Sequence, residues 1–165
     1  MRRKSLSWLP ALLIMLVIFS FSSKPADVSG ENSLNIANYV MTIYEKITDT
    51  QVEEEYRTER LLNLDHYIRK SSHFIEYAIL AAAYGLPLWI SGIRGRKLWL
   101  WSVLLAAAYA LSDEFHQRFI PGRSGELKDV LLDSFGAAFG ATIFIAVTIA
   151  LKHRNKNSQA RELSE

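Results

Sequence analysis

Three apolar runs bordered by charged residues restrict this chain to a small set of membrane architectures. The runs from Ser71 to Ile90 and from Val130 to Leu151 have the length of a bilayer-spanning helix. The run from Leu98 to Leu111 reaches that length only if its helix continues into the charged residues that follow. Because lipid offers the backbone no hydrogen-bond partner, such segments cross a membrane as helices. The runs therefore predict an all-α integral membrane protein.

A fourth apolar run, from Trp8 to Phe21, follows the basic residues Arg2, Arg3 and Lys4. It is short for a span, and its length also suits the core of a secretory signal peptide. No clean A-x-A cleavage site follows it. We expect residues 1–23 to be a retained transmembrane anchor, with a signal peptide as the alternative.

Residues 24–64 have the composition of a soluble amphipathic segment. Apolar residues recur there at helical spacing, at Leu34, Ala37, Met41, Tyr44 and Ile47. Thr50 and Glu53 match a capping box, which predicts that a second, acidic helical piece begins there. We interpret this segment as helices that lie on the membrane or over the bundle. A lid that contacts substrate is the alternative.

The distribution of basic residues predicts the topology. The charged residues of the amino terminus, the predicted turn 91–97 and the tail 152–165 are mainly lysine and arginine, whereas those of residues 24–69 are mainly acidic. By the positive-inside rule, both termini and the turn are cytoplasmic. The sequence thus predicts a four-helix transmembrane bundle in the cell membrane, with its core at 65–151 and the amphipathic segment outside, between the first and second spans.

The composition excludes any chemistry that needs cysteine and does not favour nucleic-acid binding. The chain has no cysteine, so disulfides, thiolate nucleophiles and cysteine-ligated metals are excluded. The net charge is only +2, which gives no indication of nucleic-acid binding. The partners that we expect are membrane lipid and molecules presented at the outer leaflet.

Polar residues from three spans are predicted to meet at the extracytoplasmic rim. They are Lys70, His73 and Glu76, then Asp113, Glu114, His116 and Gln117, then Asp129 and Asp133. The i+3 and i+4 spacing places His116 and Gln117 on the same helix face as Asp113. Ionisable groups at membrane depth are costly and therefore mark a candidate functional site.

Two further pairs complete the predicted site. Arg118 and Arg123 are candidates for binding a phosphate, which arginine recognises through paired hydrogen bonds. Gly136 and Gly140 form a GxxxG seam, which favours close helix packing in lipid.

Two chemistries remain open for this cluster. His73, Glu76, Asp113 and His116 offer a mixed nitrogen and oxygen shell for a divalent metal. Alternatively, Glu76 or Asp113 acts as a general base with His116 as its proton partner. The sequence specifies neither a metal nor a cofactor.

Three ordered motifs carry a family resemblance. They are Lys70-Ser-Ser-His73-Phe-Ile-Glu76-Tyr77, then Ser112-Asp113-Glu114-Phe115-His116-Gln117-Arg118-Phe119 with Pro121-Gly122-Arg123-Ser124, then Lys128-Asp129 and Asp133 with Gly136 and Gly140. Over residues 64–151 the chain resembles the VanZ-like family of bacterial membrane proteins. The resemblance implies an integral membrane protein linked to resistance to teicoplanin-type glycopeptide antibiotics.

These observations support three hypotheses. The first is a membrane-embedded hydrolase or transferase acting on a lipid-linked, phosphate-containing or cell-wall-precursor substrate. The second is a non-catalytic binder of such a precursor, of a glycopeptide antibiotic or of a partner protein. A transporter is less favoured, because the polar residues gather at one end of the spans rather than near the bilayer midplane.

Overall fold

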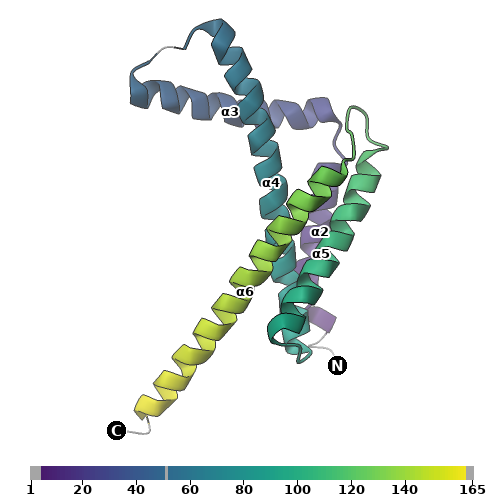
Figure 1. Ribbon diagram of the computed structural model, residues 1–165, viewed down its shortest axis with the longest axis vertical. Coiled ribbons are helices and arrows are strands. Elements are labelled where there is room, and N and C mark those ends of the chain that lie inside the picture. The colour runs from purple at the N-terminus through teal and green to yellow at the C-terminus, as the bar shows by residue number, and fades with distance from the viewer. Residues whose placement is uncertain (1–4, 51, 163–165) are drawn as a thin grey trace.

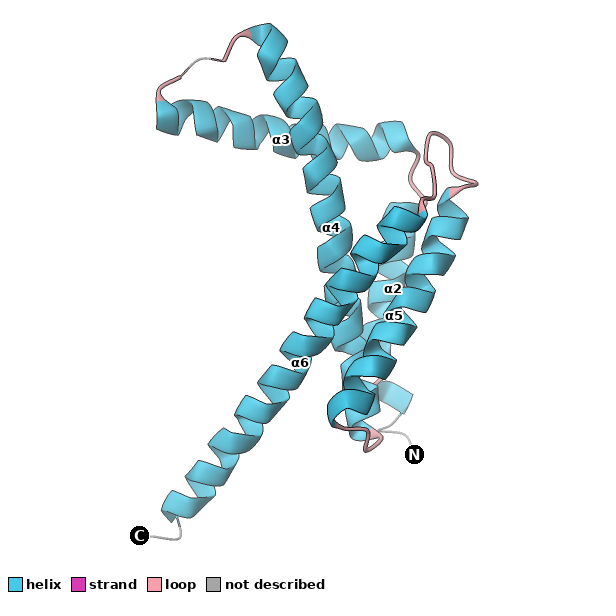
Figure 2. Ribbon diagram, viewed as in Figure 1, coloured by secondary structure: helices cyan, strands magenta, loops and turns pink. Residues whose placement is uncertain are grey.

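The computed structural model describes residues 5–50 and 52–162, and the regular elements among them are all helices (Figures 1 and 2). They are α2 (Leu9–Ser22), α3 (Ala26–Thr48), α4 (Glu54–Ile90), α5 (Gly95–Gln117) and α6 (Leu127–Glu162). The predicted all-helical class is confirmed. Arg2, Arg3 and Lys4, part of the predicted cytoplasmic amino terminus, lie outside the described residues.

Two helices are long and apolar enough to cross a membrane, over Tyr56–Ile90 in α4 and Leu127–Asn155 in α6. The pair formed by α2 and α3 is a third candidate if it counts as one broken span, since it bends by 101°. A multi-pass membrane protein fits these spans. The described residues thus hold two or three candidate spans, whereas the sequence predicted four.

The amphipathic helix α3 lies across α4 near the end where α2 stops (Figure 1). Ser33, Ala37 and Met41, spaced four residues apart, form its buried face. α3 ends at Asp49, whose φ of 50° is left-handed and cannot continue the helix. A helix in the amphipathic segment was predicted, and α3 packs against α4.

The start of α4 corrects one prediction. The helix begins at Glu54 after Glu53, which makes no side-chain cap, and the Thr50 hydroxyl donates to Thr48 Oγ1 at 2.6 Å instead of capping α4. The predicted capping box is therefore wrong, because local spacing did not reveal the competing bond to Thr48. α4 then runs unbroken past Leu64, where the predicted boundary between the outer segment and the core would lie.

The turns predicted before and after α5 are both present, with one change in length. Its first turn begins at Gly95, so the predicted turn 91–97 is shorter than expected. Beyond Gln117, the predicted turn at Pro121 and Gly122 is present, and Gly122 has a left-handed φ of 74°. The last helix, α6, extends past the predicted end at Leu151 to Glu162.

Small residues determine how closely α4 and α6 pack. A Cβ added at Gly136 would collide with the carbonyl oxygen of Phe74, and one added at Gly140 with that of Ala78. α4 and α6 run parallel, and α5 packs antiparallel against both (Figure 1). Alanines of α5 and α6 fill the core around Tyr77 and Leu80 of α4. The seam therefore fixes which residues of α4 face which residues of α6.

Candidate functional site

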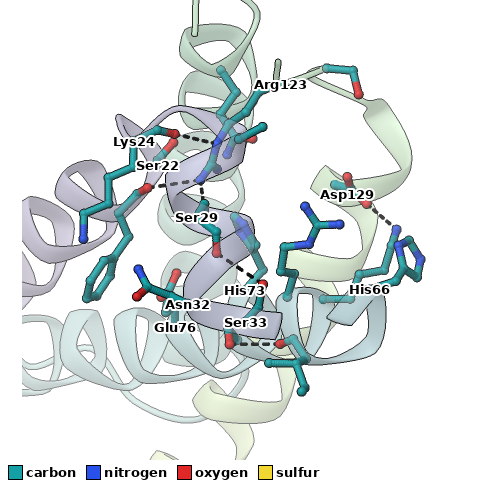
Figure 3. A pocket seen from close by; sticks show the side chains of 18 of the residues that line it. Ser22, Lys24, Ser29, Asn32, Ser33, His66, His73, Glu76, Arg123 and Asp129 are labelled. Carbon is teal, nitrogen blue, oxygen red and sulfur yellow. Dashed lines mark hydrogen bonds and ion pairs between the residues drawn. The ribbon is translucent and has the colours of Figure 1, made fainter. Parts of the chain in front are cut away.

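A polar cavity of about 630 Å³ lies beneath α3, where α4, the start of α6 and the loop after α5 meet (Figure 3). The predicted site residues that line it are Lys70, His73, Glu76, Gln117, Arg123 and Asp129. They come from α4, from α5, from the loop after it and from α6. The structure thus brings together six of the residues that the sequence singled out.

Two pairs of basic and acidic residues face each other between α4 and α6. Lys70 Nζ donates to Asp129 Oδ1 at 2.7 Å. One turn further, His73 Nδ1 lies 3.9 Å from Asp133 Oδ1. Lys70 and His73 are three residues apart and therefore share one face of α4. Asp129 and Asp133 are four residues apart and share one face of α6. The pairs therefore continue the register set by the glycine seam.

Behind the cavity wall lie two buried carboxyl groups. Asp133 is fully buried, and neither of its oxygens has a hydrogen-bond partner among the described residues. Asp113 accepts a bond from Gln117 Nε2 at 3.1 Å through Oδ2, while its Oδ1 has no such partner. Asp113 also interacts electrostatically with His73 and Glu76. These carboxyl groups therefore lie within the helix packing and not on the cavity surface.

Three predicted site residues lie away from the cavity. The ring of His116 stacks on that of Phe19, with 4.9 Å between the ring centroids. The prediction that His116 and Asp113 face one cavity is therefore wrong. Glu114 accepts the Glu126 N–H at 2.9 Å, and with Arg118 it lines a second cavity of about 170 Å³. Helical spacing alone did not show that α2 covers this face of α5.

His73, Glu76, Asp113 and His116 were also predicted as a possible set of metal ligands. His116 stacks on Phe19 and does not line the cavity, so the four residues do not form one shell. Over residues 5–50 and 52–162, no group of three or more histidine or acidic side chains is placed to hold a metal ion.

Arg123 joins the loop to the junction of α2 and α3. Its Nε donates to Lys24 O at 3.0 Å, and its Nη2 donates to Phe21 O at 3.2 Å and to Ser29 Oγ at 2.9 Å (Figure 3). Burial lowers the pKa of the guanidinium from its usual value, but an arginine stays charged at neutral pH. Arg123 therefore stabilises the carbonyl end of α2 as well as lining the cavity.

Sequence reasoning missed the wall that α3 supplies. Ser29, Asn32 and Ser33 line the cavity from this helix. The Ser33 hydroxyl donates to Asp65 Oδ1, and Asp65 Oδ2 pairs with Arg69 Nη2 at 2.9 Å. The available signal was the pair of small polar residues, Ser29 and Ser33, four residues apart on an amphipathic helix.

We expect Arg123→Gln to loosen α3 from the bundle. Hydrogen bonds to a charged group contribute about 1.5–3 kcal/mol. Amide hydrogen exchange across residues 26–36 should therefore accelerate roughly 10- to 100-fold in detergent micelles. Arg118→Gln, an exposed arginine of the same loop, is the matched control and should leave exchange in α3 unchanged. Equal exchange in both variants would show that Arg123 does not hold this junction.

The sequence pattern of the family described as VanZ/LLP1 matches residues 7–150 of this chain. Neither curated proteins nor solved structures yield a match. The matched range extends beyond the motifs at residues 64–151 to include α2 and α3. The chain therefore belongs to the VanZ/LLP1 family.

Proposed function

We propose that this protein is a membrane-embedded hydrolase or transferase acting on the phosphate-bearing head group of a lipid-linked envelope substrate. One observation carries the proposal: the polar cavity holds His73 and Glu76, a possible base and acid, among four cationic side chains. The cations are Lys24, Arg69, Lys70 and Arg123. Lys70 is paired with Asp129 and Arg69 with Asp65, and Glu126 also lines the cavity. An anionic head group of modest size suits this volume and this charge.

The topology proposed here places the cavity at the outer leaflet. α2, α4, α5 and α6 would each cross the membrane, with both termini in the cytoplasm. In support, the start of α2 and the end of α6 lie at the end of the bundle away from α3 (Figure 1). The basic Arg94, Arg96 and Lys97 lie near the turn that joins α4 to α5, and positive charge near a turn favours the cytoplasmic side.

The cavity wall also suits the apolar part of such a substrate. Phe21 and Ile36 line the cavity and are about half exposed, at 49% and 52%. Apolar side chains at a membrane interface lose little by contacting acyl or prenyl chains. A ligand could therefore place its charged head between α3 and α4 while its chain leaves past these two residues.

In the proposed hydrolysis, His73 takes a proton from water as the water oxygen bonds to phosphorus. The bond from phosphorus to the leaving oxygen breaks with its electron pair, and protonated Glu76 gives that oxygen its proton. Transfer would follow the same course with an acceptor alcohol in place of water. Positioned acids and bases of this kind contribute typically 10²–10⁴-fold to rates.

The experiment is to incubate the protein in nanodiscs with a polyprenyl diphosphate and to follow bound and free lipid by mass spectrometry. We expect retention of this lipid over a neutral diacylglycerol, together with its conversion to a lipid of lower mass or to a transfer product. Binding without conversion would instead indicate a non-catalytic binder of an envelope precursor or of a glycopeptide antibiotic. Absence of both would refute the proposal.

We expect Lys24→Gln to weaken binding of the polyprenyl diphosphate roughly tenfold, since one charge-assisted hydrogen bond contributes about 1.5 kcal/mol. Lys24 lies over the Phe21 ring at 5.0 Å and makes no ion pair with a carboxylate among the described residues, so its charge is available. Lys46→Gln, at an exposed position near the far end of α3, is the control. Titration of lipid into nanodiscs by native mass spectrometry measures both; equal affinities would show that Lys24 does not contact the head group.

A further inference from the structure

His73 presents only one of its two ring nitrogens to the cavity. The side chain is 25% exposed and lines the cavity, yet its Nδ1 is buried and has no hydrogen-bond partner among the described residues. Nε2 does not share this burial. A substrate in the cavity therefore meets Nε2, whose protonation state decides whether His73 can act as a base.

Asp133 lies on the buried side of the same ring. Its side chain has no exposed surface, and both carboxyl oxygens lack a partner in the part of the chain that the structure describes. Oδ1 is 3.9 Å from His73 Nδ1, longer than a hydrogen bond. Leaving a buried polar group without a partner costs free energy, roughly 1–3 kcal/mol. A hydrogen bond between the two side chains would give a partner to Nδ1 and to one of the two carboxyl oxygens.

The backbone holds this pair in place. Gly136 lies three residues beyond Asp133 and meets the carbonyl of Phe74, the residue after His73. The two helices are therefore in close contact beside the pair. Asp129 and Lys70 restrict the other side through their bond of 2.7 Å. The register that brings Asp133 to His73 is thus fixed on both sides.

We propose that Asp133 is a positioning residue: it accepts a hydrogen bond from Nδ1–H of His73 and so keeps Nε2 unprotonated and directed into the cavity. Its importance for catalysis rests on the function proposed above, but the tautomer of His73 does not. Neutral histidine carries one ring proton, and the bond made by one nitrogen determines the state of the other.

Among the other groups around the ring, only Asp113 competes with Asp133 as an acceptor for this bond. Lys70 can only donate, and it is already paired with Asp129. Asp113 faces the ring from α5; Gln117 occupies its Oδ2, but its buried Oδ1 has no partner among the described residues and is the one competing acceptor. Arg123 is directed to the junction of α2 and α3. The Tyr77 hydroxyl is buried without a partner and is the one competing donor for Asp133 among these groups.

Nitrogen NMR of the protein labelled with ¹⁵N-histidine in micelles tests the proposal directly. The chain has four histidines, and the spectrum of His73→Gln identifies the signals of His73. At about pH 8, above the ordinary histidine pKa of about 6.5, we expect His73 as the Nδ1–H tautomer. An Nε2–H tautomer in the unaltered protein would overturn the proposal, whatever the variants show.

The variants identify the acceptor. Asp133→Asn should preserve the Nδ1–H tautomer, because an amide oxygen also accepts, whereas Asp133→Leu should shift His73 toward Nε2–H. Asp129→Asn, one turn away, is the matched control and should leave the tautomer unchanged. An unaltered His73 signal in a folded Asp133→Leu variant would also overturn the assignment. Lipid conversion with the wrong tautomer would refute this inference alone, and the right tautomer without conversion would refute only the proposed enzyme.

Discussion

Gly140→Ala is expected to destabilise the protein by about 2–3 kcal/mol, although it adds a single methyl group. That methyl would collide with the carbonyl oxygen of Ala78, which is backbone and cannot rotate away. α4 and α6 would have to separate along the seam that fixes their register. For a chain of this size, such a loss lowers the midpoint of thermal unfolding by roughly 4–12 °C. Fluorescence-detected unfolding in detergent measures the shift.

The same substitution at Gly30 is the matched control. Gly30 lies in α3, and a Cβ added there would meet nothing within 4 Å. Alanine is favoured over glycine inside a helix by about 1 kcal/mol, so Gly30→Ala should leave the midpoint unchanged or raise it. The two variants should therefore shift the midpoint in opposite directions. If the unfolding midpoint falls equally in both variants, the close contact of Gly140 with α4 does not determine the stability.

Features set by the length of apolar runs were the ones that the sequence predicted well. The apolar runs 71–90 and 130–151 lie within α4 and α6, and Lys70 and His73, predicted on one helix face, both line the cavity. The pairing of these residues with Asp129 and Asp133 required a parallel arrangement of α4 and α6 in one register. No single helix carries that information, because it depends on how the seam aligns the two helices.

Features set by contacts between distant segments were missed. His116 was predicted beside Asp113, but its face of α5 is covered by Phe19 of α2. Arg123 was predicted as a phosphate ligand, and no local pattern indicated that it also donates to Phe21, Lys24 and Ser29. These contacts were missed for the same physical reason: a short segment shows which of its own residues are apolar or polar, but not which distant residues they will contact.

His73→Gln is expected to reduce conversion of a polyprenyl diphosphate by about 10²–10⁴-fold while the lipid still binds. Glutamine keeps the polar character of the side chain but cannot take up a proton near neutral pH. Glu76→Gln should cause a loss of the same order, because it removes the acid that protonates the leaving oxygen. Single-turnover assays in nanodiscs, with binding measured in parallel, separate loss of chemistry from loss of affinity.

A matched histidine distinguishes chemistry from a general effect of the substitution. His153 lies near the exposed end of α6, far along the helix from the cavity, and His153→Gln should convert lipid at the unaltered rate. If His73→Gln and His153→Gln convert lipid equally, His73 is not the base, and the cavity is better described as a binding site. If His73→Gln abolishes binding as well, His73 contacts the ligand before any chemistry. Retained binding with lost conversion is the combination that an acid–base site requires, because a proton acceptor contributes to the transition state rather than to the bound ground state.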